Sequence, residues 1–191
     1  MSGATNLNLP NQITLARLVL SIVVFVLVPL GYYMAGLIVF VIAAGTDWLD
    51  GYIARKYGLV TKLGRILDPF VDKFLICGLF IYLAADYPRS GIAAWMAVVV
   101  VARELLVTVI RGFLEGEGVD FSAKMAGKLK MVFQCAAAVA SLLALSFGDQ
   151  TPPWLQMSLL VLVWLAVIST IHSGAGYVWQ AMKILGLQAD R

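Results

Sequence analysis

The sequence predicts an all-α integral membrane protein with six transmembrane helices in a single domain, residues 1–191. Hydrophobic residues make up 61% of the chain and charged residues 13%, and the mean hydropathy is +0.90. Soluble domains have a much more polar composition. A transmembrane helix needs about 20 mainly apolar residues. Runs of this kind recur six times, at residues 13–30, 34–54, 66–85, 91–112, 125–147 and 153–182, and the connections are too short for a second folded unit.

The first run follows MSGATNLNLPNQ, which has no basic residue, and five further runs come after it. We therefore expect it to remain a helix rather than to be cleaved as a signal peptide. Cys77 and Cys135 lie inside apolar runs, where we expect buried thiols and neither a disulfide nor a zinc site. His172, in the last run, has no neighbouring Cys or acidic partner in the sequence, so we expect a hydrogen-bonded packing residue.

The basic residues predict the orientation in the membrane. Six spans put both termini and the connections near 55–65 and 113–124 on one face. That face has ten basic residues in or close to it, and the other face has Arg89 alone. The positive-inside rule makes the basic face cytoplasmic. It suits anionic headgroups or a phosphorylated substrate, whereas no loop is long enough for a nucleic-acid docking surface. The ten are Arg55, Lys56, Lys62, Arg65, Arg111, Lys124, Lys128, Lys130, Lys183 and Arg191.

Four of the eleven acidic residues lie in one stretch, TDWLDGYIARKYGLVTKLGRILDPFVDKF. Asp47 and Asp50 close the second span at i, i+3, and Asp68 and Asp72 open the third at i, i+4. Each pair therefore lies on one face of its helix. If the two helices run antiparallel, both pairs meet at the cytoplasmic end of the bundle.

Four facing carboxylates repel one another unless cations lie between them. Oxygen ligands without Cys or His indicate Mg²⁺, Mn²⁺ or Ca²⁺ rather than zinc, and two such ions suit a phosphoryl displacement. The alternative is a set of surface carboxylates in ordinary ion pairs. That alternative does not explain two acids on one face of each of two helices. Its basic partners would be Arg55, Lys56, Lys62, Arg65 and Lys73.

Glycines punctuate the same stretch. We expect Gly58 to end the second helix and Gly64 to form a further break, which would allow an antiparallel return. Gly51 lies inside a helix, where it costs about 1 kcal/mol relative to Ala. Two explanations stay open: close approach of a ligand to the backbone, or helix packing through Gly51 and Ala54.

Intramembrane basic residues form the last group. Arg103 and Arg111 are about 12 Å apart along one helix and about 80° apart around it, so they can address one cavity. With Arg17 and the lysines that begin the fifth span, they suit a phosphomonoester beside a metal site. Alternatively, Arg103 pairs with Glu104 or another acid and the lysines snorkel. These lysines are Lys124, Lys128 and Lys130.

The acidic stretch resembles the signature of the CDP-alcohol phosphotransferases, D-x2-D-G-x2-A-R-x8-G-x3-D-x3-D. The segments PNQITLAR, AREL through Arg111, and GKLKMVFQ look like the corresponding parts of members that use sn-glycerol 3-phosphate, with Met131 where those members usually have a hydroxyl residue. The resemblance thus runs from Pro10 to Gln134. Every fixed position of the signature is filled, by Asp47, Asp50, Gly51, Ala54, Arg55, Gly64, Asp68 and Asp72.

The resemblance implies a six-helix enzyme of the bacterial inner membrane, usually a homodimer, with two Mg²⁺ or Mn²⁺ ions and a cytoplasmic active site. It would transfer the phosphatidyl group of CDP-diacylglycerol to sn-glycerol 3-phosphate, giving phosphatidylglycerol phosphate and CMP. The four aspartates would hold the metals, and Asp72 would also be the base. The CDP part would contact Gly51, Ala54, Arg55 and Gly64. The acceptor's phosphate would bind Arg103, Arg111 and Lys128, with Arg17 as a weaker candidate.

Two other functions remain open at this point. A sibling enzyme would use serine, inositol phosphate or phosphatidylglycerol as acceptor, although the buried basic residues disfavour an uncharged one. A divalent-cation transporter would line an ion path with carboxylates. Transporters of that kind tend to have repeated halves and midplane sites, whereas this sequence shows no internal repeat and its acids lie at one end of the bundle.

Overall fold

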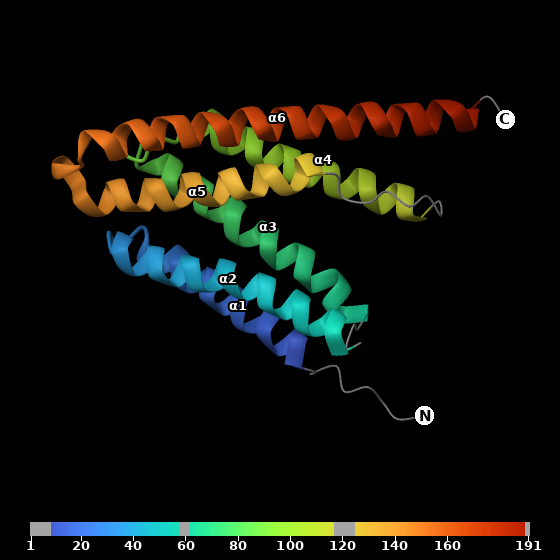
Figure 1. Ribbon diagram of the computed structural model, residues 1–191, viewed down its shortest axis with the longest axis horizontal. Coiled ribbons are helices and arrows are strands. Elements are labelled where there is room, and N and C mark those ends of the chain that lie inside the picture. The colour runs from blue at the N-terminus through green and yellow to red at the C-terminus, as the bar shows by residue number, and fades with distance from the viewer. Residues whose placement is uncertain (1–8, 58–61, 117–124, 190–191) are drawn as a thin grey trace.

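A computed structural model describes residues 9–57, 62–116 and 125–189, in which six long α-helices are joined by short connections (Figure 1). Some side chains inside these helices lie outside the description, among them those of residues 47–57, 62–63 and 65–66. The described residues contain no strand. The helices are α1 (Leu9–Leu27), α2 (Tyr33–Tyr57), α3 (Lys62–Ala85), α4 (Ala94–Gly116), α5 (Met125–Phe147) and α6 (Pro153–Ala189), with a 3-10 turn, η1 (Gly148–Gln150), before α6.

Each predicted apolar run corresponds to one helix, so the all-helical prediction is confirmed. Among the described residues, two stretches are long and apolar enough to cross a membrane, Gly127–Gln150 and Pro153–Gly186. Six crossings therefore stay a prediction. The break expected at Gly64 is wrong: Gly64 lies buried inside the first turn of α3. A helical glycine costs only about 1 kcal/mol, which packing at a buried position can offset. Gly58 lies outside the described residues.

The helices form two groups, which are joined through α3 and through a contact of α2 with α5. α1 packs on α2, while α6 packs on α4 and α5. α3 contacts α1 from the first group and α4 and α5 from the second, and in Figure 1 it crosses diagonally between the two. The C-terminal ends of α2, α4 and α6 lie on the same side as the start of α1 (Figure 1), as an alternating up-and-down bundle requires.

The main apolar core occupies one half of the bundle, and a smaller apolar cluster between α4 and α6 lies in the other. The buried side chains of the main core come from the end of α1, the start of α2 and the end of α3, as with Val24, Phe40 and Leu83. They also come from the first half of α4, the second half of α5 and the first half of α6. The other half buries polar side chains: Asn11, Thr14, Arg17, Arg103, Glu104, Lys130, Gln134, Thr170 and Ser173. Burying so many polar groups is costly unless they are paired or functional, so this half is the place to look for a site.

Close packing of α1 on α3 depends on Gly78. A Cβ atom built at Gly78 would overlap the ring of Phe25. That ring lies 5.1 Å from the Phe74 ring and 5.5 Å from the Tyr82 ring, measured between centroids. The glycine thus admits an aromatic side chain between two others, and this contact fixes the position of α1 along α3.

The outer surface of the bundle is apolar on every long helix. Each long helix has at least one large aliphatic side chain that is 55% or more exposed. A soluble protein rarely exposes contiguous apolar surface on all its faces, so this surface suits a lipid environment and supports a membrane protein. Examples, one from each helix, are Val19, Ile38, Ile81, Val98, Val132 and Ile168.

Candidate active site

Two of the four predicted metal ligands are described, and both lie on α3. Asp68 and Asp72 are half-buried and one helical turn apart. The Thr14 hydroxyl of α1 donates a 2.6 Å hydrogen bond to Asp68 Oδ1, and Thr14 is itself buried. The backbones of Asp47 and Asp50 belong to the second half of α2, but their side chains lie outside the described residues.

The two described carboxylates, Asp68 and Asp72, fit part of a divalent-metal site. They offer oxygen ligands, which Mg²⁺ and Mn²⁺ prefer. A hydrogen bond such as the one from Thr14 commonly orients a metal-binding carboxylate. Among the described side chains, no group of three or more His, Cys, Asp or Glu residues is close enough to hold an ion. The predicted set of four includes two ligands beyond that part of the chain, so the metal pair stays a prediction.

The predicted nucleotide contacts fall mainly outside the description. The side-chain environments of Gly51, Ala54 and Arg55, in the last third of α2, are not described, and Gly64 is buried near the start of α3. Gly64 is therefore on the same helix as Asp68, one turn before it. The four positions stay predictions as nucleotide contacts.

Arg17 is placed on the side of the carboxylates. It is 1% exposed and lies one turn after Thr14 on α1, the helix that packs against α2 and α3. The Ser21 hydroxyl donates a 2.8 Å hydrogen bond to the backbone carbonyl oxygen of Arg17. A buried guanidinium here can balance the charge of nearby carboxylates.

The Arg103 side chain contacts both its own helix and α6. Its Nη1 donates to both oxygens of Glu104, at 3.1 and 3.3 Å, and its Nη2 donates to Ser173 Oγ at 2.6 Å. Its guanidinium carbon lies 5.5 Å from the centre of the Tyr177 ring. The pairing of Arg103 with Glu104, one of the two sequence-based alternatives, is thus present. A pair of this kind fixes the guanidinium in place and does not by itself exclude a phosphate ligand.

A buried polar network continues from Glu104 into α5 and α6. Lys130 Nζ donates to Glu104 Oε1, and it lies 3.4 Å from Gln134 Oε1. Gln134 Nε2 in turn donates to Thr170 Oγ1 at 2.9 Å. All of these side chains are at most 6% exposed, so the network ties α4, α5 and α6 together in the polar half of the bundle.

The remaining predicted cations lie around this network. Arg111 is half-buried, two turns beyond Arg103 on α4, and Lys128 is exposed in the first turn of α5. Lys73, which follows Asp72 on α3, donates a 2.6 Å hydrogen bond to Thr108 Oγ1 of α4. This bond links the carboxylate helix to the helix that carries both arginines.

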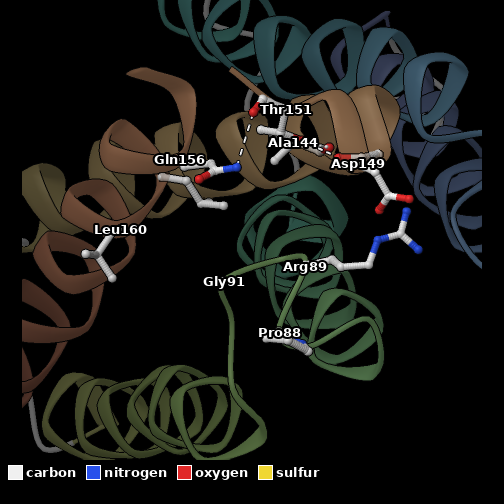
Figure 2. A pocket seen from close by; sticks show the side chains of 10 residues that line it. Pro88, Arg89, Gly91, Ala144, Asp149, Thr151, Gln156 and Leu160 are labelled. Carbon is white, nitrogen blue, oxygen red and sulfur yellow. Dashed lines mark hydrogen bonds between the residues drawn. The ribbon is translucent and has the colours of Figure 1, made fainter. Parts of the chain in front are cut away.

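Two concavities of the described bundle have charged side chains in their lining. One, of about 430 Å³, is a mainly apolar groove between α3 and α4 that includes Lys73, Glu104 and Thr108. The other, of about 540 Å³, lies at the opposite end, between the α3–α4 connection and the start of α6. Figure 2 shows Arg89 and Asp149 pointing toward one another there, and Gln156 reaching the carbonyl oxygen of Thr151. This second cavity is far along α3 from Asp68 and forms no part of the candidate site.

Comparison with known proteins shows the family of the chain. The family model for CDP-alcohol phosphatidyltransferases matches residues 7–172. The chain belongs to the CDP-alcohol phosphatidyltransferase family. The matched range covers both signature helices and the polar network, so the resemblance of the acidic stretch is confirmed at the family level.

Individual relatives of this family are similar over nearly their full length. The chain is 39% identical to a CDP-diacylglycerol--glycerol-3-phosphate 3-phosphatidyltransferase of Bacillus subtilis, over 92% of this chain and 97% of that protein. It is 35% identical to the protein of that name from Rickettsia bellii, over 89% and 93%. It is also 36% identical to a probable phosphatidylglycerophosphate synthase of Mycobacterium tuberculosis, over 94% and 84%.

Three contacts in this phosphatidyltransferase went unrecognised in the sequence. They are Thr14 to Asp68, Lys73 to Thr108, and Lys130 to Glu104, between residues 54, 35 and 26 positions apart. Each joins two helices, so helix periodicity along one element does not reveal it. The one usable signal was Glu104 itself, because an acid in an apolar run requires a cationic partner.

Proposed function

We propose that this protein transfers the phosphatidyl group of CDP-diacylglycerol to sn-glycerol 3-phosphate, releasing CMP and forming phosphatidylglycerol phosphate. The observation that carries the proposal is the similarity, over about nine-tenths of the chain, to family members named for this reaction. The placement of Asp68, Arg103 and Lys130 in one polar half of the bundle supports it, because the reaction needs metal-binding carboxylates near a site for a phosphomonoester.

The donor side of the site comprises the four aspartates and the signature residues. Asp47, Asp50, Asp68 and Asp72 would hold two Mg²⁺ or Mn²⁺ ions, which supply charge neutralisation for the diphosphate and the CMP leaving group. Thr14 orients Asp68 in this arrangement. The nucleotide would lie against Gly51, Ala54, Arg55 and Gly64, where small residues make room and the arginine meets the diphosphate.

The acceptor side comprises Asp72 and the basic residues. Asp72 takes the proton from the acceptor hydroxyl that attacks phosphorus, and the chain otherwise acts by holding the two reactants in position. Arg103, Arg111 and Lys128 bind the acceptor's phosphate, with Arg17 in a weaker role. The first turn of α5 supports this assignment: a Cβ atom at Gly127 would lie 3.9 Å from Arg103 Nη2, and helix N-termini favour anions.

The setting of the reaction follows from the substrates. A lipid-linked diphosphate has to be attacked at a membrane surface, where water and lipid meet. We place the polar half of the bundle at the cytoplasmic rim of the bacterial inner membrane, in a single six-span domain that acts as a homodimer. Support comes from the basic residues, which crowd one face of the predicted bundle, and from the apolar outer surface of all six long helices.

The test uses purified full-length protein in detergent, CDP-diacylglycerol and radiolabelled glycerol 3-phosphate. We expect label in lipid and CMP in equal amounts, with Mg²⁺ or Mn²⁺ required. The Asp72→Asn variant should lose turnover and keep both its fold and its binding of CDP-diacylglycerol. CMP release without labelled lipid would contradict the acceptor, and near-normal turnover of Asp72→Asn would remove Asp72 as the base.

A further inference from the structure

Glu104 is an acid buried among cations. It is 3% exposed in the middle of α4. Both of its carboxylate oxygens accept hydrogen bonds from Arg103 Nη1, and Oε1 also accepts one from Lys130 Nζ of α5. A single carboxylate therefore joins two cationic side chains that come from two different helices.

Two buried cations this close together need a negative charge between them. Arg103 and Lys130 are 8% and 6% exposed, and two like charges brought together in a poorly hydrated site repel strongly. Glu104 compensates one of them, so the three side chains together carry one net positive charge. This net positive charge attracts a phosphomonoester, which bears close to two negative charges at neutral pH.

The rest of the contacts fix the geometry of Arg103. Ser173 accepts from Nη2, and the Tyr177 ring lies beside the guanidinium. On α6, a Cβ atom at Gly174 would approach Arg103 Cγ to 3.1 Å, so the arginine stem occupies space that a side chain there would take. With Glu104 on one side and α6 on the other, the guanidinium has one well-defined position.

We propose that Glu104 is a positioning residue of the acceptor site: it holds Arg103 and Lys130 side by side, so that the phosphate of glycerol 3-phosphate meets a preformed pair of cations. This inference rests on the proposed function, in which Arg103 binds that phosphate. It assigns Glu104 no contact with either substrate. Its effect is on the affinity for the acceptor, through the position of two cations.

A positioning role and a purely electrostatic role of Glu104 predict opposite changes in the KM for glycerol 3-phosphate. Glu104→Gln raises the net charge of the group from +1 to +2, and a purely electrostatic role would then lower the KM for glycerol 3-phosphate. If Glu104 acts by positioning, the two cations separate instead. The KM for glycerol 3-phosphate then rises, by at least about tenfold, while the KM for CDP-diacylglycerol stays within about twofold of wild type.

The experiment compares full-length Glu104→Gln, Glu104→Asp and Thr170→Val with wild type in the transfer assay, with both KM values and kcat measured. Thr170→Val is the matched control. It removes a buried hydroxyl that accepts from Gln134 in the same network without touching Glu104, so it should lower thermal stability and leave both KM values unchanged. Glu104→Asp retains the charge at a shorter reach and should raise the KM for glycerol 3-phosphate several-fold. It serves as the test if Glu104→Gln does not fold.

The outcomes separate this inference from the proposed function. An unchanged or lowered KM for glycerol 3-phosphate in Glu104→Gln, or in Glu104→Asp where only that variant folds, overturns the positioning role. Arg103→Lys then decides the rest. A raised KM for glycerol 3-phosphate in Arg103→Lys keeps the proposed acceptor site, whereas wild-type values in both Arg103→Lys and Glu104→Gln remove Arg103 from it.

Discussion

At the scale of single residues, the site depends on hydrogen bonds that cross between helices. Thr14 of α1 donates to Asp68 of α3, at 2.6 Å from a buried position. A hydroxyl in this place limits the rotation of the carboxylate. It therefore links the packing of α1 on α3 to the ligand geometry proposed for the metals.

Replacing Thr14 with Val keeps the shape of the side chain and removes the donor. We expect the Mg²⁺ concentration for half-maximal activity to rise about tenfold or more, with kcat/KM reduced at low Mg²⁺ and partly restored at high Mg²⁺. Ser21→Ala is the control, because Ser21 is a buried hydroxyl on the same helix that bonds only a carbonyl of α1 among the described contacts. An unchanged Mg²⁺ dependence in Thr14→Val would contradict the orienting role.

Residue spacing predicted part of this picture. The i, i+4 relation of Asp68 and Asp72 follows from helix geometry alone, and both lie on α3 as expected, where they are half-buried. The partner of Asp68 did not follow, because Thr14 is 54 residues away and reaches it only once α1 has packed on α3. The contact between Lys130 and Glu104 also joins two helices, so residue spacing along a single helix could not predict it.

At the scale of elements, α1 and α3 approach closely at Gly78. The Phe25 ring fills the space that a side chain at Gly78 would take, and it packs near Phe74 and Tyr82. Because Thr14 lies three turns before Phe25 on the same helix, this contact also sets where Thr14 meets Asp68.

Gly78→Ala should therefore displace the Phe25 ring and lower the free energy of unfolding by about 1–3 kcal/mol, measured by thermal unfolding in detergent. A glycine in α2 provides the comparison: nothing lies within 4 Å of a Cβ atom at Gly45, so Gly45→Ala should be neutral or slightly stabilising. Equal stability of Gly78→Ala and wild type would show that the ring moves without cost.

Helix positions were well predicted where apolar runs meet clear end signals. The fifth helix was predicted at 125–147 and spans Met125–Phe147, because lysines mark its start and Gly148 follows it with a φ of +57°. The sixth was predicted to end at 182 and extends to Ala189. Hydropathy falls at Lys183, but no proline follows, so the helix continues past its apolar part.

At the scale of the whole molecule, the bundle separates two environments. The main apolar core fills one half, and most of the buried polar and charged side chains lie in the other, beside a smaller apolar cluster. The start of α1 and the end of α6 lie on the side of the polar half (Figure 1). This polarity follows from the sequence in outline, since the acidic stretch and most basic residues flank alternate connections.

The proposed orientation can be tested by labelling single cysteines with a membrane-impermeant maleimide, in a chain whose Cys77 and Cys135 are replaced by alanine. Arg89, in the α3–α4 connection, and Lys183, near the end of α6, are both exposed, and these two segments lie at opposite ends of the bundle (Figure 1). We expect Arg89→Cys to react in intact cells and Lys183→Cys to react only after the membrane is opened. Labelling of Lys183→Cys in intact cells would place the polar half on the wrong side for this account.

The central claim is the identity of the acceptor, and a competition assay tests it most directly. Purified protein receives CDP-diacylglycerol and Mg²⁺ with glycerol 3-phosphate, inositol phosphate, serine and phosphatidylglycerol together at equal concentration, and the lipid products are identified by mass spectrometry. We predict phosphatidylglycerol phosphate as the dominant product, with CMP released in equal amount. A dominant product from serine, inositol phosphate or phosphatidylglycerol would contradict the proposed acceptor.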